Sequence, residues 1–433
     1  MRAALIALVA VMGLLLAPLS SGAELQSLAT AARAILGADQ GVYVEAADGT
    51  VLLAQAAATP VHPASVSKVP TTLALLRKLG PDHRFVTTFT AKGRVIDGTL
   101  HGDLIVASDG DPSLVDEDAL LVAGRLRQSG INRVSGSLRV TAPLIFDWKT
   151  DSDGASLRRA LSGETPAAAL AAVRALDLLN ATASAAGSPA GIAAGVSTSG
   201  SFVPLGIRFG TAAAPPTAAA AALPATATAT ATATALIVHR SQSLLPLVKS
   251  LNDYSNNIFA PFAEAAGGAA AVQALARSVV PEEMRSEITL GDGAGADPTN
   301  RLSPRVAVQL LRVLEQELAK SGHALCDILP VAGIDDGTLH DRLNGPGEAG
   351  HVLGKTGTFG DYGASALIGA IRTTARGTVY FAVLNHNVPV PQARQRQDRF
   401  VRFLLRQFHT TAWSYQRDPR PAITRAEVAI VLP

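Results

Sequence analysis

Cysteine is almost absent from this sequence: Cys326 is the single one among 433 residues. No disulfide can form within the chain, and we expect this lone cysteine to be a small buried apolar side chain. Aromatic residues are also scarce, at 4%, although hydrophobic residues make up 48% of the sequence, largely through alanine. The length and this apolar content suffice for an ample core in two or more domains.

Excess charge is lacking as well. There are 37 Lys and Arg residues against 35 Asp and Glu, so the formal net charge is +2 and no basic patch stands out. Nucleic acid is therefore not expected as a partner. The nine histidines are scattered without a spacing such as His-Glu-x-x-His, and no glycine loop of the phosphate-binding kind occurs. We expect no metal and no other cofactor.

The N-terminus has the pattern of an export signal. Arg2 is followed by an apolar run from Ala3 to Leu19 and by the small residues Ser21-Gly22-Ala23. This pattern predicts a signal peptide at residues 1–23 and an exported, periplasmic protein. An uncleaved anchor is the alternative, but the run is short for a membrane span and contains Gly13 and Pro18. Membrane association is expected to be peripheral at most.

Three short motifs occur in order along the chain, and together they describe a serine acyl-transfer site. They are a Ser-x-x-Lys, a Ser-x-Asn and a Lys-Thr-Gly, formed by Ser65 and Lys68, by Ser255 and Asn257, and by Lys355-Thr356-Gly357. Each motif is weak or moderate evidence alone, and their order and setting make the set specific. Penicillin-binding proteins and β-lactamases carry a set of this kind.

The first motif predicts an activated nucleophile. A serine hydroxyl needs a base within hydrogen-bond reach, and residues three apart on a helix share a face, so Lys68 can approach Ser65. Ser65 is expected at a helix N-terminus, where free N–H groups favour developing negative charge. A lysine base must be uncharged, which requires burial or a nearby positive charge. Lys355 is a candidate for that charge.

The other two motifs supply polar groups for a substrate. Ser255 can relay a proton to a leaving amine, and the Asn257 amide can bond a substrate carbonyl. Lys355 and Thr356 can bind a carboxylate, on a strand whose glycines, including Gly357, allow close approach of a substrate backbone. The N–H groups of Thr358 and Ser65 can form an oxyanion hole.

Further segments extend the similarity beyond the three motifs. The chain resembles the D-alanyl-D-alanine carboxypeptidase/endopeptidase family, the low-molecular-mass class C penicillin-binding proteins with a large insertion after the nucleophile. The resemblance covers nearly the whole chain after the signal and is weak between about Ser152 and Leu236. Its additional motifs are Pro63-Ala64-Ser65-Val66, Gly102-Asp103-Leu104, Gly110-Asp111-Pro112-Ser113-Leu114, His239-Arg240-Ser241, Asp292-Gly293, Leu329-Pro330-Val331-Ala332-Gly333 and Asp336-Gly337-Thr338-Leu339.

The resemblance implies a serine-type D-Ala-D-Ala carboxypeptidase or DD-endopeptidase that acts on peptidoglycan stem peptides. Ser65 would form the acyl-enzyme with Lys68 as base, and β-lactam antibiotics would bind at the same site. A serine β-lactamase is one alternative. A catalytically impaired scaffold that binds the cell wall is another, because Pro70 follows the nucleophile where the family usually has an aliphatic residue. Proline beyond the first helical turn costs about 3 kcal/mol.

The expected fold class is α/β (α+β): a penicillin-binding/β-lactamase-like transpeptidase domain with an antiparallel sheet flanked by helices. Residues 24–84 and 236–433 are assigned to this catalytic domain. Residues 85–235 are assigned to a large β-rich inserted domain, with a strand-forming run from Phe85 to Phe146 as its first part. This insert ends in an Ala/Thr-rich low-complexity segment, which we expect to be mobile or at an edge.

Individual elements are also predicted. A helix is expected from Glu24 to Leu36 and another from Leu244 to Leu251, and Ala155 to Ala186 is expected to be partly helical. Four strands are expected, around Val42-Tyr43-Val44, Val51-Leu52-Leu53, Ser365–Ile371 and Thr378–Asn385. Asp398 to Phe408 has the pattern of an amphipathic helix, which favours cover of a sheet over a place on a membrane surface.

Overall fold

The computed structural model describes residues 22–185, 206–210, 235–360, 363–418 and 426–430. The predicted signal peptide lies outside these residues except for its last two positions. The Ala/Thr-rich stretch from 211 to 235 lies outside them except for its last position. Within the described ranges, no helix combines the length and apolarity that crossing a bilayer requires.

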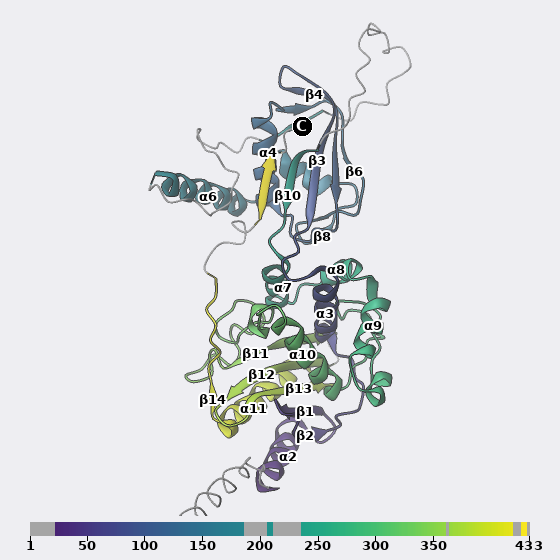
Figure 1. Cartoon of the computed structure of the whole chain (residues 1–433), viewed down its shortest axis with the longest axis vertical. Helices are drawn as coiled ribbons and strands as arrows, with labels where there is room; N and C mark the ends of the chain where they lie inside the picture. The colour runs from purple at the N-terminus through teal and green to yellow at the C-terminus, as the bar shows by residue number, and fades with distance from the viewer. Residues whose placement is uncertain (1–21, 186–205, 211–234, 361–362, 419–425, 431–433) are drawn as a thin grey trace, which may run out of the picture. The chain divides into compact units, whose positions relative to one another are not determined.

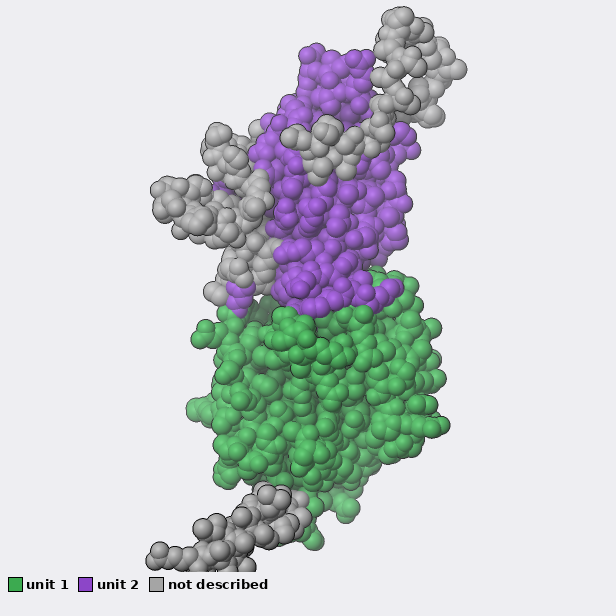
Figure 2. All heavy atoms as spheres, viewed as in Figure 1, with its two compact units in different colours: residues 1–77, 249–417 green, residues 78–248, 418–433 purple. Residues whose placement is uncertain are grey.

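Two compact units divide the chain (Figure 2). The first comprises residues 1–77 and 249–417, and the second comprises residues 78–248 and 418–433. The chain leaves the first unit within helix α3 (Lys68–Leu79) and returns to it within helix α7 (Leu244–Asp253). The division therefore falls inside two helices, whereas the sequence-based limits were placed at 84/85 and 235/236.

The first unit contains an antiparallel sheet (Figure 1). Its strand order is β11 (Val352–Phe359), β12 (Ala364–Thr373), β13 (Gly377–Asn385), β1 (Gly41–Ala46) and β2 (Val51–Gln55), and β14 (Thr410–Thr411) pairs with β12. Val44 lies opposite Phe381, so an early strand and a late strand pair directly in one sheet. The two predicted early strands and the two predicted late strands are confirmed.

One face of this sheet is apolar and carries two helices. Side chains alternate along a strand, and Val42 and Val44 of β1 join the core with residues of α2 (Gly22–Leu36) and α11 (Val390–Phe408). The predicted first helix is confirmed. α11 begins earlier than Asp398, because Pro391 is tolerated in a first helical turn. The apolar face of α11 is buried against the sheet, as expected for a helix that covers a sheet rather than one that lies on a membrane surface.

The opposite face of the same strands carries polar side chains among apolar ones and packs against helix α10 (Pro304–Ala319). Tyr43 and Glu45, which flank Val44 in β1, point toward this face. The Tyr43 hydroxyl donates a hydrogen bond to Glu45 at 2.8 Å. Arg312 and Gln309 of α10 both contact Glu45. The remaining helices of the first unit are η1 (Ala64–Ser67), α8 (Phe259–Ala265), α9 (Gly268–Ser278), η2 (Glu282–Glu287) and η3 (Leu325–Asp327).

The second unit has a mixed sheet. Its order is β15 (Glu427–Ile430), β10 (Ala235–Arg240), β3 (Val86–Ile96), β4 (Thr99–Ser108), β5 (Arg133–Val134) and β9 (Arg208–Phe209), with β6 (Leu138–Val140) beside β4. A separate pair joins β7 (Ile145–Phe146) to β8 (Lys149–Thr150). β10 and β15 pair with this sheet, which is why the second unit includes segments that the sequence placed in the catalytic domain.

A helix interrupts the run from Phe85 to Phe146 that was predicted to form strands. This helix, α4 (Asp116–Gln128), starts with three acidic residues, which suit the positive end of a helix dipole. Its buried residues Ala119, Val122, Ala123 and Leu126 recur at helical spacing and join the core of the unit. Two more helices follow, α5 (Ala155–Leu161) and α6 (Ala167–Ala185), so the expected helical content from Ala155 is confirmed.

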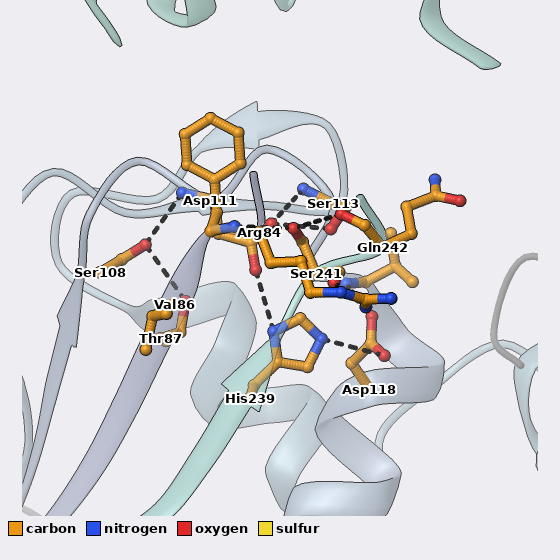
Figure 3. A network of polar contacts seen from close by, with 12 residues as sticks. Arg84, Val86, Thr87, Ser108, Asp111, Ser113, Asp118, His239, Ser241 and Gln242 are labelled. Carbon is orange, nitrogen blue, oxygen red and sulfur yellow. Dashed lines mark hydrogen bonds and ion pairs between the residues drawn. The ribbon is translucent and has the colours of Figure 1, made fainter. Parts of the chain in front are cut away.

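A charge cluster lies buried between β10 and the segment that leads into α4 (Figure 3). The ring nitrogens of His239 lie 2.9 Å from a carboxylate oxygen of Asp111 and 3.3 Å from one of Asp118. Burial alone would lower the pKa of this imidazole, but the two carboxylates outweigh burial and raise the pKa to about 10. His239 is therefore a charged group that holds the segment after β4 against β10.

Replacing this cation is expected to destabilise the fold. His239→Gln leaves two buried carboxylates without a positive partner, so the free energy of unfolding at pH 7 should fall by about 3–5 kcal/mol. The contribution is fully present below the ordinary imidazole value of 6.5 and is lost as the pH rises through about 10. In urea unfolding, the difference in free energy of unfolding between His239→Gln and wild type should therefore become smaller as the pH rises over that range. His101→Gln, on an exposed position of β4, is the control; an equal effect there would contradict the assignment.

Candidate active site

The turn before α3 brings the first motif together. η1 is a 3₁₀ turn, in which side chains three residues apart lie above one another. Lys68 Nζ consequently lies 2.6 Å from Ser65 Oγ. Pro70 is the third residue of α3. The first four backbone N–H groups of a helix have no partner within the helix, so the N–H that proline lacks is not needed there. The proline is thus compatible with both the helix and the Ser65–Lys68 contact.

The amine of Lys68 is completely buried and has three neighbours. Besides Ser65, it donates hydrogen bonds to the backbone carbonyl of Ala294 at 2.7 Å and to Asn257 Oδ1 at 3.4 Å. Burial lowers the pKa of Lys68 to about 7, although the charge of Asp292 acts in the opposite direction. A large fraction of this amine is therefore neutral near pH 7 and able to accept a proton.

The second motif follows α7 in a tight turn. Ser255 has a φ of 55°, in the left-handed region that few side chains adopt. Its N–H donates to Asn252 O, and the N–H of Asn256 donates to Leu251 O at 3.0 Å, which closes the end of the helix. The turn directs Ser255 to Lys355 and Asn257 to Lys68. The second motif therefore contacts the lysine of the third motif and the lysine of the first motif.

The third motif lies on β11, the edge strand of the described sheet. Lys355 is fully buried and donates to Ser255 Oγ at 2.8 Å and to the carbonyl of Thr356 at 2.9 Å. Burial and the neighbouring charge of Lys68 hold the pKa of Lys355 well below its ordinary value, while Asp253 opposes this shift. Two amines in one buried site favour a state in which only one of them is charged.

Two glycines let the nucleophile turn pack closely. A Cβ at Gly357 of β11 would lie 2.7 Å from the carbonyl oxygen of Pro63. A Cβ at Gly295 would lie 1.9 Å from the carbonyl oxygen of Ala64, and Gly295 has a φ of +88°. The backbones of β11 and of the segment around Gly295 therefore enclose η1 and exclude water from Lys68.

The predicted substrate-binding residues lie in sequence on β11 next to this turn. Thr356 is nearly buried, and its hydroxyl donates to Thr338 Oγ1 at 2.9 Å. Thr358 is exposed, and its hydroxyl accepts a hydrogen bond from Arg394 at 2.9 Å. All eight residues proposed from the sequence thus lie on or beside η1, the turn after α7 and β11.

Sequence reasoning missed several residues of the site. The carbonyl of Ala294 is a direct partner of Lys68, but a backbone group leaves no signature of its own. Its signal is Asp292, which accepts hydrogen bonds from the N–H groups of Gly295 and Ala296 and so sets the turn. Thr338 lies in one of the segments that resemble the family, but its contact with Thr356 joins residues far apart in the sequence, as does the contact of Arg394 with Thr358.

Sequence comparison places these residues within a known family. Residues 22–213 and 220–407 match the family described as D-Ala-D-Ala carboxypeptidase 3 (S13). A D-alanyl-D-alanine carboxypeptidase from Actinomadura sp. (strain R39) is 26% identical over 458 aligned residues, which cover 87% of this chain and 84% of that protein.

Solved structures share the fold. A predatory endopeptidase from Bdellovibrio bacteriovorus has a TM-score of 0.67 at 20% identity, covering 90% of this chain and 98% of that one. Its penicillin G-acylated form, in complex with an immunity protein, gives 0.66 at 21% identity over 90% and 99% of the two chains. Penicillin binding protein 4 from Haemophilus influenzae gives 0.58 at 17% identity over 90% and 100%. The predicted penicillin-binding fold is confirmed.

The packing of η1 can be tested with a matched pair of glycines. Gly295 and Gly322 both have positive φ, but a Cβ at Gly322 would meet nothing within 4 Å. Gly322→Ala should cost only the backbone strain of about 1–2 kcal/mol. Gly295→Ala must also displace the backbone of Ala64, and we expect at least about 2 kcal/mol more. Urea unfolding of the two variants measures the difference. Equal losses in the free energy of unfolding would show that the close packing at Gly295 does not contribute to stability.

Proposed function

The chain belongs to the D-Ala-D-Ala carboxypeptidase 3 (S13) family of peptidases, and we propose that it is a serine-type DD-peptidase of peptidoglycan stem peptides. The bond cleaved is the amide between two D-alanines, at the end of a stem peptide or in a cross-bridge that presents the same bond. The observation that carries this proposal is the contact of 2.6 Å between Ser65 Oγ and a buried lysine amine whose pKa is about 7.

The proposed reaction begins with proton transfer from Ser65 to Lys68. The Ser65 oxygen attacks the carbonyl carbon, and the N–H groups of Ser65 and Thr358 stabilise the resulting oxyanion. The C–N bond then breaks, and the leaving amine receives the proton through the hydroxyl of Ser255. Water attacks the acyl-enzyme with Lys68 again as base, which releases the shortened peptide and restores Ser65.

Substrate binding is assigned to β11 and the turn after α7. The N-terminal half of β11 is already covered, since Gly354 donates to Pro330 O and Val352 accepts from Ala332. The half from Thr356 to Phe359 lies beside η1 and suits an extended peptide. Asn257 would orient the acyl chain through its amide, and Lys355 with Thr356 would bind the terminal carboxylate by charge and hydroxyl.

β-Lactam antibiotics are the proposed inhibitors, because their reactive amide carbonyl and carboxylate can meet the same groups. Peptidoglycan lies outside the cytoplasmic membrane, so the proposed substrate agrees with the export that residues 1–23 predict. No cofactor is part of the proposed reaction. A serine β-lactamase would share the acylation step and differ in rapid hydrolysis of the acyl-enzyme, which a nitrocefin turnover assay distinguishes.

Acylation by a fluorescent penicillin tests the nucleophile. Ser65→Ala should abolish covalent labelling and leave the unfolding midpoint nearly unchanged, because only a hydroxyl is removed. Ser67→Ala is the matched control: it alters a buried serine of the same 3₁₀ turn and should keep the label. If Ser65→Ala is still labelled, Ser65 is not the nucleophile. If the wild-type protein takes no label, the proposed serine-peptidase function is contradicted.

The pKa of Lys68 predicts the acid limb of the reaction. Protonated Lys68 cannot accept the proton of Ser65, so the acylation rate should fall as the pH drops below about 7. Well below that value, the rate should fall about tenfold for each pH unit. Stopped-flow labelling between pH 5 and 8 measures this profile. A rate that stays constant across that range would exclude Lys68 as a base that titrates there.

A further inference from the structure

A histidine ring lies against the nucleophile turn and has no part in the proposed reaction. Nδ1 of His62 accepts a hydrogen bond at 3.1 Å from the N–H of Ala64, the first residue of η1. Nε2 of the same ring lies 3.0 Å from the backbone carbonyl oxygen of Asp297. The ring also stacks on Phe359, the last residue of β11, with 3.9 Å between the ring centroids. Three segments that build the site therefore meet at one half-buried side chain.

The two hydrogen-bond partners determine which ring nitrogen carries the proton. A backbone N–H can only donate and a carbonyl oxygen can only accept, so Nδ1 has the lone pair and Nε2 has the hydrogen. This imidazole is neutral. Burial holds the pKa of His62 below its ordinary value of 6.5, and the charge of Arg301 acts in the same direction. Asp297 and Asp292 act against this shift. The ring is therefore in the form that accepts a hydrogen bond from the nucleophile turn.

The backbone of Ala64 needs a partner that holds it in place. Its φ is 50°, in the left-handed region that alanine rarely adopts. Such a conformation persists only where the surrounding structure imposes it. The planar peptide group between Ala64 and Ser65 carries the Ser65 N–H, so the conformation of Ala64 sets the direction in which this N–H points.

His62 contacts both sides of the proposed oxyanion hole. The two donors assigned to that hole are the N–H groups of Ser65 and Thr358. The imidazole is bonded to the residue before Ser65 and stacked on the residue after Thr358. The stack with Phe359 and the contact of Nε2 with a carbonyl together fix the ring, so that Nδ1 stays directed at the nucleophile turn.

We propose that His62 is a positioning residue of the oxyanion hole, which holds the left-handed conformation of Ala64 and so directs the Ser65 N–H at the carbonyl oxygen under attack. This inference rests on the proposed function, because it assigns the Ser65 N–H to an oxyanion. His62 acts through Ala64 on a group that is needed most in the transition state. Its loss should therefore lower the rate constant of acylation and leave the initial noncovalent complex unchanged.

Two substitutions of His62 separate its two hydrogen bonds. The amide oxygen of Asn can accept from the N–H two residues further along the chain, as in an Asx turn, so His62→Asn keeps the bond to Ala64. The longer side chain of His62→Gln places its amide near the position of Nε2. It keeps a donor for Asp297 and loses the acceptor for Ala64. Stopped-flow acylation by a penicillin at pH 8 measures the acylation rate constant and the dissociation constant of the noncovalent complex separately.

The two variants should differ in rate. We expect His62→Gln to lower the acylation rate constant about 30-fold, less than removal of an oxyanion-hole donor does. His62→Asn should stay within about threefold of wild type. The dissociation constant of the noncovalent complex should change less than about twofold in both variants. His351→Gln is the matched control, because it alters another half-buried histidine of the first unit, which contacts Thr410, and it should leave both constants unchanged.

A second position tests the ring without altering the histidine. Phe359→Leu removes the stacked ring and keeps an apolar side chain, so the imidazole is held less firmly. The acylation rate constant should fall about fivefold, again without a change in the dissociation constant. In the double variant with His62→Gln, the rate constant should stay within about twofold of that of His62→Gln alone, because the stack acts through the same histidine.

Each outcome bears on one of the two proposals. Complete labelling that is slow in His62→Gln and fast in His62→Asn supports the role of His62. Wild-type rates in His62→Gln, or equal losses in both variants, overturn it. If less protein is labelled at saturation, the variant has a folding defect, and the rate of Phe359→Leu decides: a wild-type rate there overturns the role. These results leave the proposed function intact as long as wild type is labelled at Ser65. A wild type without labelling instead overturns the proposed function itself.

Discussion

The burial of the Lys68 amine is the constraint on which the rest of the site depends. A charged ammonium in a water-poor pocket carries a desolvation cost of several kcal/mol, so burial favours the neutral amine. A neutral amine is also what a proton acceptor for Ser65 must be. Part of this burial comes from backbone, since Gly295 and Gly357 bring two backbone segments against the nucleophile turn, and the Phe259 ring lies 5.8 Å from the amine. The same close packing therefore holds η1 in place and sets its chemistry.

The local backbone resolves a conflict between the helix and the nucleophile. A regular α-helix through Ser65 would place Pro70 beyond the first turn, at a cost of about 3 kcal/mol. The chain instead forms a 3₁₀ turn over Ala64–Ser67 and begins α3 at Lys68. Three residues per turn align Ser65 with Lys68, and the late start of the α-helix accommodates the proline. Pro70 thus gives no support to the alternative of an impaired scaffold.

Local patterns predicted much of the first unit, because its elements carry their own signals. The hairpin around Asp48-Gly49, the strands before and after Arg376-Gly377 and the amphipathic face of α11 follow from turn residues and periodicity. The other features depend on strand pairing between segments far apart in the sequence, which local patterns do not predict. The register of β10 against β3 assigned a later segment to the second unit, and α4 was missed because its apolar residues follow a strand-rich run. At the site, the motifs predicted the functional side chains, whereas the contact of Lys68 with the carbonyl of Ala294 is visible only in the folded chain.

Both units bury opposite charges side by side: His239 with Asp111 and Asp118 in the second unit, and Lys249 with Asp335 and Asp253 in the first. Around His239, the free carboxylate oxygens accept further hydrogen bonds: Asp111 from Ser113, and Asp118 from Val115 N–H. With each carboxylate also held by a backbone N–H, the cluster fixes the segment between β4 and α4 against β10. Around Lys249, Asp335 accepts hydrogen bonds from Val331 N–H and Tyr415 Oη, and Asp253 Oδ1 lies 3.6 Å from the same lysine amine. An incompletely paired buried carboxylate is costly in isolation. That cost falls where a cation lies beside the carboxylate, and in both clusters the ion pair joins segments that are far apart in the sequence.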